Sequence, residues 1–254
     1  MTYTALVLAG SRPGRDTFAA QFGTDLKALI PVGGEPMVLR PVRALLESES
    51  VGKILVLGQA PDRIAAALPG DPRIEVRESA ATIAETVLAL LDNPATEWPL
   101  LVTTADHALL KPATVDEFCR ASAGADIAIG AVERANLLRR LPGAQRTWLS
   151  FRGGAYTGAN LFALGSPSVR PAIELWRSVE QDRKKAWRIL SLLGPAMLVL
   201  VALRVVSLDE VMVRLSARLG LTIRAVSLSD PLAGVDIDKP EDHALAESIL
   251  AGQV

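Results

Sequence analysis

The chain has 254 residues, of which 50% are hydrophobic and 22% are charged, so it can bury a sizeable core. Its 27 basic and 28 acidic residues give a net charge of -1, which argues against a general nucleic-acid binder, because such proteins usually carry a basic excess. The single cysteine, Cys119, excludes a disulfide framework and a cysteine-based zinc site, and it favours a reducing, cytoplasmic compartment. The first apolar stretch, ending at Leu8, is too short for a signal peptide.

Strand and helix patterns alternate along the first two thirds of the chain. Short apolar runs predict buried strands at 3–10, 52–58, 73–78, 99–106 and 125–132. Apolar residues at helical spacing, in two cases with a proline near the start, predict helices at 35–48, 60–68, 82–93 and 111–122. This alternation is typical of an α/β fold with a doubly wound, mainly parallel sheet.

The last third of the chain departs from this alternation. Residues 154–165 predict a strand and a turn, 221–228 a strand, and 238–250 a closing helix entered at Pro240. Between these elements, residues 168–220 form a long helical pattern with a very apolar middle. We interpret 168–220 as a helical insertion within a single domain that comprises residues 1–254.

The apolar middle of this block, "ILSLLGPAMLVLVALRVV", approaches the roughly 20 residues that a membrane span requires. Gly194, Pro195 and Arg204 interrupt it, and a Gly-Pro pair predicts the end of one helix and the start of another. Three interpretations remain: a buried hairpin or homo-oligomer contact, which we favour; a peripheral contact with a membrane or lipid substrate, supported by the basic flank "DRKKAWR"; and a true span. Localisation is therefore expected to be cytoplasmic, with membrane association as the alternative.

A basic, glycine-containing loop, Gly10–Arg15, follows the first strand. Ligands of parallel sheets bind beyond the carboxyl ends of the strands, where this loop lies. Its glycines allow backbone N–H groups to approach a phosphate, and Arg12 and Arg15 can neutralise the charge. Lys27 supplies a compact charge that can reach a transferring phosphoryl group. A flexible, solvated turn explains the loop equally well.

Carboxylates occupy two further positions that suit a metal. Asp106 ends the predicted strand 99–106, and Asp236 and Asp238 follow each other at a spacing of two, so both point the same way if the chain is extended. Carboxylates from separate strand ends suit Mg²⁺ when phosphate oxygens complete its shell. The alternatives are a turn or cap role for Asp106 and a helix cap for Asp238. His107 and His243 fit no metal-ligand pattern, and we expect them at the surface or behind the site.

Four short motifs occur in an order that resembles the MobA-like NTP transferases, nucleotidyltransferases with a GT-A-type fold. They are "LAGSRPGR", "KALIPVGGEPM", "TTADHALL" and "DIDKPED", and the resemblance covers about residues 1–165 and 221–254. The chain departs from the family pattern at Ser11, which replaces a second glycine, and in a longer loop before Lys27. The block at 168–220 is more than a minimal member needs.

The resemblance implies an enzyme that transfers NMP from an NTP to a phosphorylated acceptor, a small phospho-alcohol or sugar phosphate, and releases pyrophosphate. Mg²⁺ is the implied cofactor, and CTP is slightly favoured as the NTP. The implied catalytic residues are Arg15 and Lys27. The other implied site residues are Leu8, Ala9, Gly10, Ser11, Arg12, Gly14 and Thr82 for the nucleotide, Gly158 and Asn160 for the acceptor, and Asp106, Asp236 and Asp238 for the metal.

Several of these assignments have a competing explanation. Thr82 and Glu85 have the spacing of a capping box, and "YTGAN" around Gly158 also fits a tight turn. A GT-A-type glycosyltransferase that uses an NDP-sugar, and a catalytically inactive relative that only binds nucleotide, are the alternative functions. The sequence leaves the acceptor, the oligomeric state and any lipid contact open.

Overall fold

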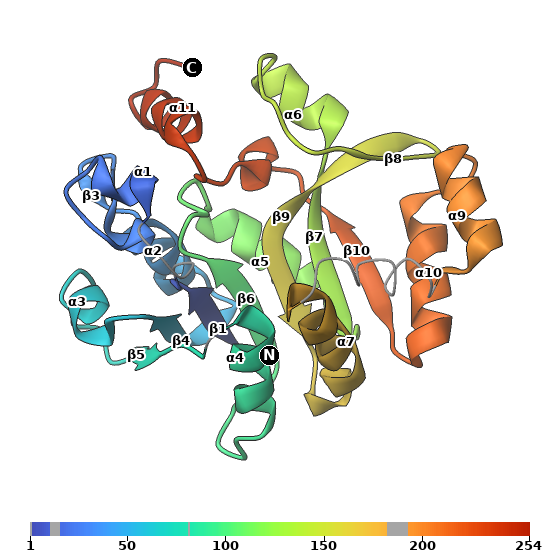
Figure 1. Ribbon diagram of the computed structural model, residues 1–254, viewed down its shortest axis with the longest axis horizontal. Helices are drawn as coiled ribbons and strands as arrows, with labels where there is room; N and C mark the ends of the chain where they lie inside the picture. Colours follow the sequence, from blue (N-terminus) through green and yellow to red (C-terminus); the bar gives the residue numbers. More distant parts are fainter. Residues whose placement is uncertain (1, 11–15, 81, 182–192) are drawn as a thin grey trace.

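A computed structural model describes residues 2–10, 16–80, 82–181 and 193–254, and these form a central sheet with helices on both faces (Figure 1). The eight-stranded sheet has the order β10-β7-β9-β6-β1-β4-β5, and β8 pairs with β9 outside this path. The strands are β1 (Tyr3–Leu8), β4 (Val51–Gly58), β5 (Ile74–Glu78), β6 (Leu100–Thr104), β7 (Ile127–Glu133), β8 (Leu149–Phe151), β9 (Gly154–Leu164) and β10 (Ile223–Ser227).

The pairing confirms the predicted mainly parallel α/β sheet. Strand β1 runs parallel to β4 and β6, β4 runs parallel to β5, and β10 runs parallel to β7. Only the pairs made by β9, with β6, β7 and β8, are antiparallel within the described sheet. Because β9 is reversed, its beginning lies at the carboxyl edge of the parallel strands, where Gly158 pairs with Ala131.

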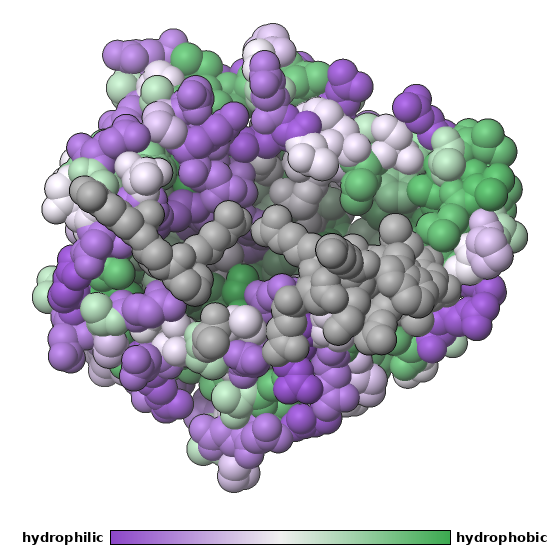
Figure 2. Space-filling model, in the orientation of Figure 1, coloured by the Kyte–Doolittle hydropathy of each residue, from purple (hydrophilic) through white to green (hydrophobic). Residues whose placement is uncertain are grey.

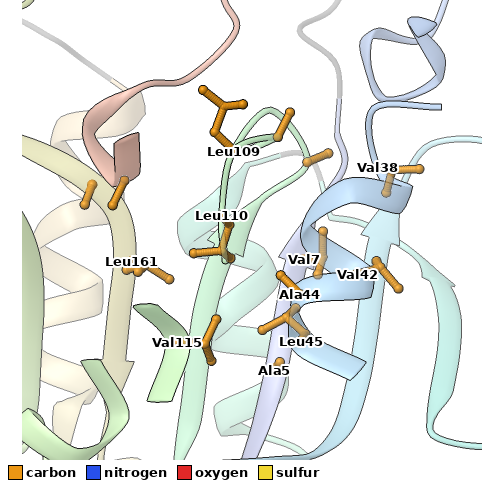
Figure 3. Packing of buried hydrophobic residues seen from close by; sticks show 14 of the residues in the cluster. Ala5, Val7, Val38, Val42, Ala44, Leu45, Leu109, Leu110, Val115 and Leu161 are labelled. Carbon is orange, nitrogen blue, oxygen red and sulfur yellow. The ribbon is translucent and has the colours of Figure 1, made fainter. Parts of the chain in front are cut away.

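Alternate residues of the central strand face two separate layers of helices. Ala5 and Val7 of β1 belong to the larger core cluster, whereas Leu6 belongs to a second cluster. Figure 3 shows part of the larger cluster, in which Val42 and Leu45 lie beside Ala5 and Val7. The helices of the first two thirds are α1 (Thr17–Ala20), α2 (Leu39–Glu47), α3 (Pro61–Ala65), α4 (Ile83–Leu91), α5 (Pro112–Ala121) and α6 (Arg134–Arg140).

The predicted helix at 35–48 begins later than expected, because a small hairpin precedes it. Strands β2 (Pro31–Val32) and β3 (Glu35–Pro36) pair around Gly33 and Gly34, whose φ angles of 62° and 78° favour glycine. The closing helix α11 (Pro240–Leu250) contacts this hairpin, and Glu247 Oε1 accepts a hydrogen bond of 2.7 Å from Gly33 N. The end of the chain is thereby fixed to the segment that carries Lys27.

The described part of the 168–220 block is helical and divides into two packing groups. After a short 3₁₀ turn, η2 (Pro167–Val169), helix α7 (Arg170–Gln181) packs against α4, and Glu180 accepts hydrogen bonds from Ile83 N and Ala84 N. Helices α9 (Pro195–Ala202) and α10 (Leu208–Leu219) form a separate small cluster with Phe151 of β8. The predicted break of the apolar run at Gly194 agrees with the start of α9 at Pro195.

Helix α9 presents apolar side chains to solvent. Val199 in α9 is 56% exposed and Leu203, directly after the helix, is 66% exposed, and a hydrophobic area lies over α9 in Figure 2. Among the described helices, none combines the length and the apolar character that crossing a bilayer would require. An oligomer contact or a lipid contact through this face stays a prediction.

Candidate active site

The side chain of Lys27 lies between two of the predicted metal-binding carboxylates. Its Nζ is 2.5 Å from Asp106 Oδ2 and 2.5 Å from Asp238 Oδ1. Lys27 begins the short 3₁₀ helix η1 (Lys27–Leu29), Asp106 follows the end of β6, and Asp238 precedes α11. Three segments that are distant in sequence therefore meet at the carboxyl edge of the parallel strands.

The charges of this cluster keep Lys27 protonated. Burial by itself would lower the pKa of the Lys27 ammonium, but the charges and hydrogen bonds of Asp106 and Asp238 outweigh it and raise the pKa above its ordinary value. The site thus holds one fixed cation between two carboxylates, of which Asp238 is the more exposed, at 63% of its side chain against 18% for Asp106.

Asp106 is hydrogen-bonded to the last residue of β6 and to the segment that follows η4 (Pro231–Gly234). Thr104 Oγ1 donates a hydrogen bond to Asp106 Oδ1, and the backbone oxygen of Asp106 accepts one from Ile237 N at 3.1 Å. The backbone bond places the segment with Asp236 and Asp238 directly beside the end of β6. The "TTAD" and "DID" motifs are therefore in contact through main chain as well as through Lys27.

Asp236 and Asp238 form different hydrogen bonds with the described residues. Asp238 contacts Lys27, whereas Asp236 accepts hydrogen bonds from Arg146 Nη1 at 3.1 Å and from Asn160 Nδ2 at 3.2 Å. Ile237, which lies between them, is fully buried, whereas Asp236 is partly buried and Asp238 is exposed, and this alternation fits an extended segment. Burial raises the pKa of Asp236; Arg146 opposes this rise, and the charges of Asp238 and Asp106 add to it.

The two predicted acceptor residues lie on β9 and differ in their surroundings. Asn160 has a left-handed φ of 47° close to an irregularity in the β7–β9 pairing, and its side chain reaches Asp236. A Cβ atom added to Gly158 would meet nothing within 4 Å, so this position borders open space. The segment is part of a strand, and the tight-turn alternative does not hold.

The predicted nucleotide-binding residues Leu8, Ala9 and Gly10 follow one another at the end of β1. Two of their backbone groups are already bonded within the sheet, since Ala9 N donates to Leu57 O at 2.8 Å and Leu8 O accepts from Ala105 N at 3.0 Å. Gly10 lies near the side chains of Gln59 and Ser79. The remaining predicted residues of this loop, Ser11, Arg12, Gly14 and the catalytic candidate Arg15, lie outside the described residues.

Thr82 is the N-cap of α4, as its spacing to Glu85 suggested. Its hydroxyl accepts a hydrogen bond of 3.2 Å from Glu85 N. The carboxylate of Glu180 accepts hydrogen bonds from the first two N–H groups of the helix, Ile83 N and Ala84 N. The start of α4 is therefore already capped twice. A contact between Thr82 and a nucleotide stays a prediction.

Of the two places expected for His107, the surface and the region behind the site, the structure excludes the surface; for Arg146 the sequence indicated no place. His107 is not at the surface: it is 1% exposed, and its Nδ1 lies 3.2 Å from Thr103 Oγ1. Burial lowers the pKa of His107 to about 4, and the charge of Asp106 opposes this effect. No pattern in the sequence distinguishes Arg146 from the other arginines between residues 134 and 152, because its carboxylate partners are about 90 positions away.

The donor set fits the magnesium ion that the resemblance implied. Asp106 and Asp238 offer hard carboxylate oxygens and already share one cation, the ammonium of Lys27. Among the described residues there is no cluster of three or more acidic, histidine or cysteine side chains arranged to hold a metal. Two carboxylates would therefore need phosphate oxygens and water to complete the shell, which is how Mg²⁺ is usually held beside a nucleotide.

Comparisons with known proteins identify the family of the chain. The sequence matches the family described as MobA-like NTP transferase domain over residues 5–196, so the "DIDKPED" motif lies outside the matched part. A hypothetical transferase from Thermus thermophilus is 30% identical, with a TM-score of 0.81, covering 96% of this chain and 100% of that chain. The comparison with curated proteins found no match.

Two further solved structures share the fold at low identity. One is a 2-C-methyl-D-erythritol 4-phosphate cytidylyltransferase, also from Thermus thermophilus, at 15% identity and a TM-score of 0.55, covering 99% of this chain and 100% of that chain. The other is a CMP:2-keto-3-deoxy-manno-octonic acid synthetase in complex with CTP, at 11% identity and a TM-score of 0.58, with the same coverage. Since the family match spans more than half of the sequence, the chain belongs to the MobA-like NTP transferase domain family.

Proposed function

We propose that the protein is a nucleotidyltransferase that transfers NMP from an NTP, with CTP preferred, to a phosphorylated small alcohol or sugar phosphate. The observation that carries the proposal is the placement of Lys27 between Asp106 and Asp238 at the carboxyl edge of the parallel strands. Such transfer depends on positioning and charge neutralisation more than on covalent help from the protein, and this site supplies both. The cytidine compounds in the names of the two low-identity structures support CTP.

In this reaction an oxygen of the acceptor phosphate attacks the α-phosphorus of the NTP. The bond from the α-phosphorus to the oxygen that bridges to the β-phosphate breaks, and pyrophosphate leaves with the electron pair. Lys27 is the residue that stabilises negative charge on the triphosphate, and Arg15 has the same role by resemblance. Asp106 and Asp238 would hold Mg²⁺, which supplies charge neutralisation on the phosphate oxygens when bound.

Binding of nucleotides is measured first, by thermal unfolding of the purified protein with each of the four NTPs and Mg²⁺. A ligand at 100 times its dissociation constant stabilises the native state by about 2.7 kcal/mol, which is readily detected. We expect CTP to give the largest increase in melting temperature. Lys27→Ala should lose this increase. Lys53→Ala should keep it, because Lys53 of β4 is paired with Glu75 of β5 instead.

Turnover is measured next, as pyrophosphate release with a panel of phosphorylated alcohols and sugar phosphates. Release that depends on both NTP and acceptor, and that is lost in Lys27→Ala, supports the proposal. Stabilisation by NDP-sugars but not by NTPs would instead favour the glycosyltransferase alternative. NTP binding with no release for any acceptor in the panel would favour the inactive relative.

A further inference from the structure

The guanidinium of Arg146 contacts both ends of the segment from 236 to 242, which is also bonded to the end of β6 through Ile237 N and Asp106 O. We propose that Arg146 is a positioning residue of the active site, which fixes this segment so that Asp238 faces Lys27. Arg146 lies between α6 and β8, and 11% of its side chain is exposed. The expected effect of Arg146 on turnover rests on the proposed nucleotidyl transfer, but its expected effect on the position of Asp238 does not.

Arg146 contacts both ends of this segment at once. Its Nη1 lies 3.1 Å from Asp236 Oδ1 and 3.2 Å from Asp242 Oδ1, and its Nη2 donates to the backbone oxygen of Asp236 at 3.4 Å. A guanidinium presents several donors in a rigid plane, so one side chain can bridge two carboxylates. Asp238 lies between the two residues that are bridged.

The second oxygen of each bridged carboxylate binds a group of the site. Asp242 Oδ2 accepts a hydrogen bond of 3.3 Å from Asp238 N, and Asp236 Oδ2 accepts one from Asn160 Nδ2. A continuous series of contacts therefore runs from Arg146 through Asp242 to the backbone of Asp238, and a second series reaches β9. Displacement of Arg146 would release the residue that completes the pair with Lys27.

The loop that carries Arg146 is itself fixed to the fold. The guanidinium of Arg134 lies over the ring of Trp148, 6.0 Å from its centroid, and Trp148 packs against the main core. Asn136 Nδ2 donates to Ser229 O at 2.9 Å, which fixes α6 to the segment after β10. Arg146 thus connects a rigid part of the domain to a residue whose side chain is largely exposed, so it is suited to position Asp238.

The geometric test compares crystal structures of the parent protein and Arg146→Met. We expect the variant to lose the contact between Lys27 Nζ and Asp238 Oδ1 and to keep the contact between Lys27 Nζ and Asp106 Oδ2. Arg43→Met is the matched control, because Arg43 also binds a carboxylate through two nitrogens, that of Glu35, but contacts neither Asp238 nor Lys27. Retention of both Lys27 contacts in Arg146→Met would overturn the proposal, whatever the activity of the parent.

The functional test measures kcat and KM separately for pyrophosphate release. A misplacement of about 1 Å can lower the rate of a positioned reaction by about 100-fold, so we expect a fall of that order in kcat/KM for Arg146→Met and none for Arg43→Met. The Mg²⁺ concentration for half-maximal thermal stabilisation by NTP should rise in parallel. A merely structural role would lower the melting temperature without changing this concentration.

Two further variants keep the test decisive if Arg146→Met does not fold. Arg146→Lys retains the charge but cannot bridge Asp236 and Asp242 as a planar group, and Asp242→Asn removes the charge that Arg146 holds. We expect both to lower kcat/KM, and the double variant to lose little more than either single one, since both act through the same contacts. Parent-like kinetics in Arg146→Lys, or full additivity in the double variant, would contradict the proposal.

Discussion

Replacement of His107 should remove a specific pH dependence of stability. His107 is buried, and its pKa of about 4 in the folded protein lies below its ordinary value of 6.5. Between these two values the unfolded chain binds a proton that the folded protein does not. The contribution of His107 to the free energy of unfolding is therefore fully present above about pH 6.5, and it is lost as the pH drops toward 4.

The size of the effect follows from the two pKa values. At about 1.4 kcal/mol per pKa unit, the full difference is about 3.5 kcal/mol. The part that is lost between about pH 7.5 and about pH 5.5 is about 1.3 kcal/mol, since proton uptake by the unfolded chain is nearly complete by the lower pH. Carboxylates titrate mainly below this interval, so the loss in this interval belongs chiefly to histidine.

Urea denaturation at these two pH values measures the difference for the parent, His107→Gln and His243→Gln. His107 should contribute a loss of about 1.3 kcal/mol between the two conditions, which His243→Gln should retain and His107→Gln should lack. The chain has only two histidines, so His243→Gln also assigns the remaining imidazole signal in NMR. A titration midpoint of His107 near 6.5, or an equal loss of stability in parent and His107→Gln, would refute the argument.

Two other predictions concern residues outside the ion pairs. Burial raises the pKa of the Cys119 thiol to about 12, and the charge of Asp116 adds to this rise. The native protein should therefore not react with thiol reagents at neutral pH, whereas the unfolded chain should react once per molecule. Full labelling of the folded protein would contradict this prediction. In Gly58→Ala the new Cβ would lie 2.6 Å from Ile64 Cδ1 and 2.9 Å from Ala9 O, so the free energy of unfolding should fall by about 1–3 kcal/mol in urea titrations. Gly70→Ala is its control, because a Cβ there meets nothing within 4 Å, and equal stability of the two variants would count against the steric argument.

The elements that carry the fold could be predicted because their signals are local. The strand Tyr3–Leu8 is marked by a continuous apolar run and the helix Pro112–Ala121 by apolar residues at helical spacing, and both signals depend only on the residues of the element itself. The reversal of β9 could not be predicted in this way, since the direction of a strand depends on its neighbours and not on its own pattern. Helix α6 and strand β8 are short, at 7 and 3 residues, and periodicity is weak over such lengths.

The motifs predicted those residues of the candidate site that they contain, but they did not predict which side chains contact one another. The motifs identified Lys27, Asp106 and Asp238, which the fold brings together. They grouped Asp236 with Asp238, but a guanidinium from another part of the chain gives Asp236 its own partner. The burial of His107 could not be predicted from the sequence either. Its neighbour in the chain, Asp106, faces the site, whereas His107 faces the interior, and no local pattern separates the two directions.

The pairing of Lys27 with Asp238 has a consequence for how the protein is made. The two residues are 211 positions apart in the sequence. At the roughly 5–20 residues per second of protein synthesis, Lys27 is added about 10–40 s before Asp238. Domains generally fold as units, so the strands that meet at this site are expected to pack together only once the C-terminal segment is available. A nascent chain that ends before Asp238 carries Lys27 and Asp106 without their third member, so the proposed nucleotide site is complete only when translation has nearly finished.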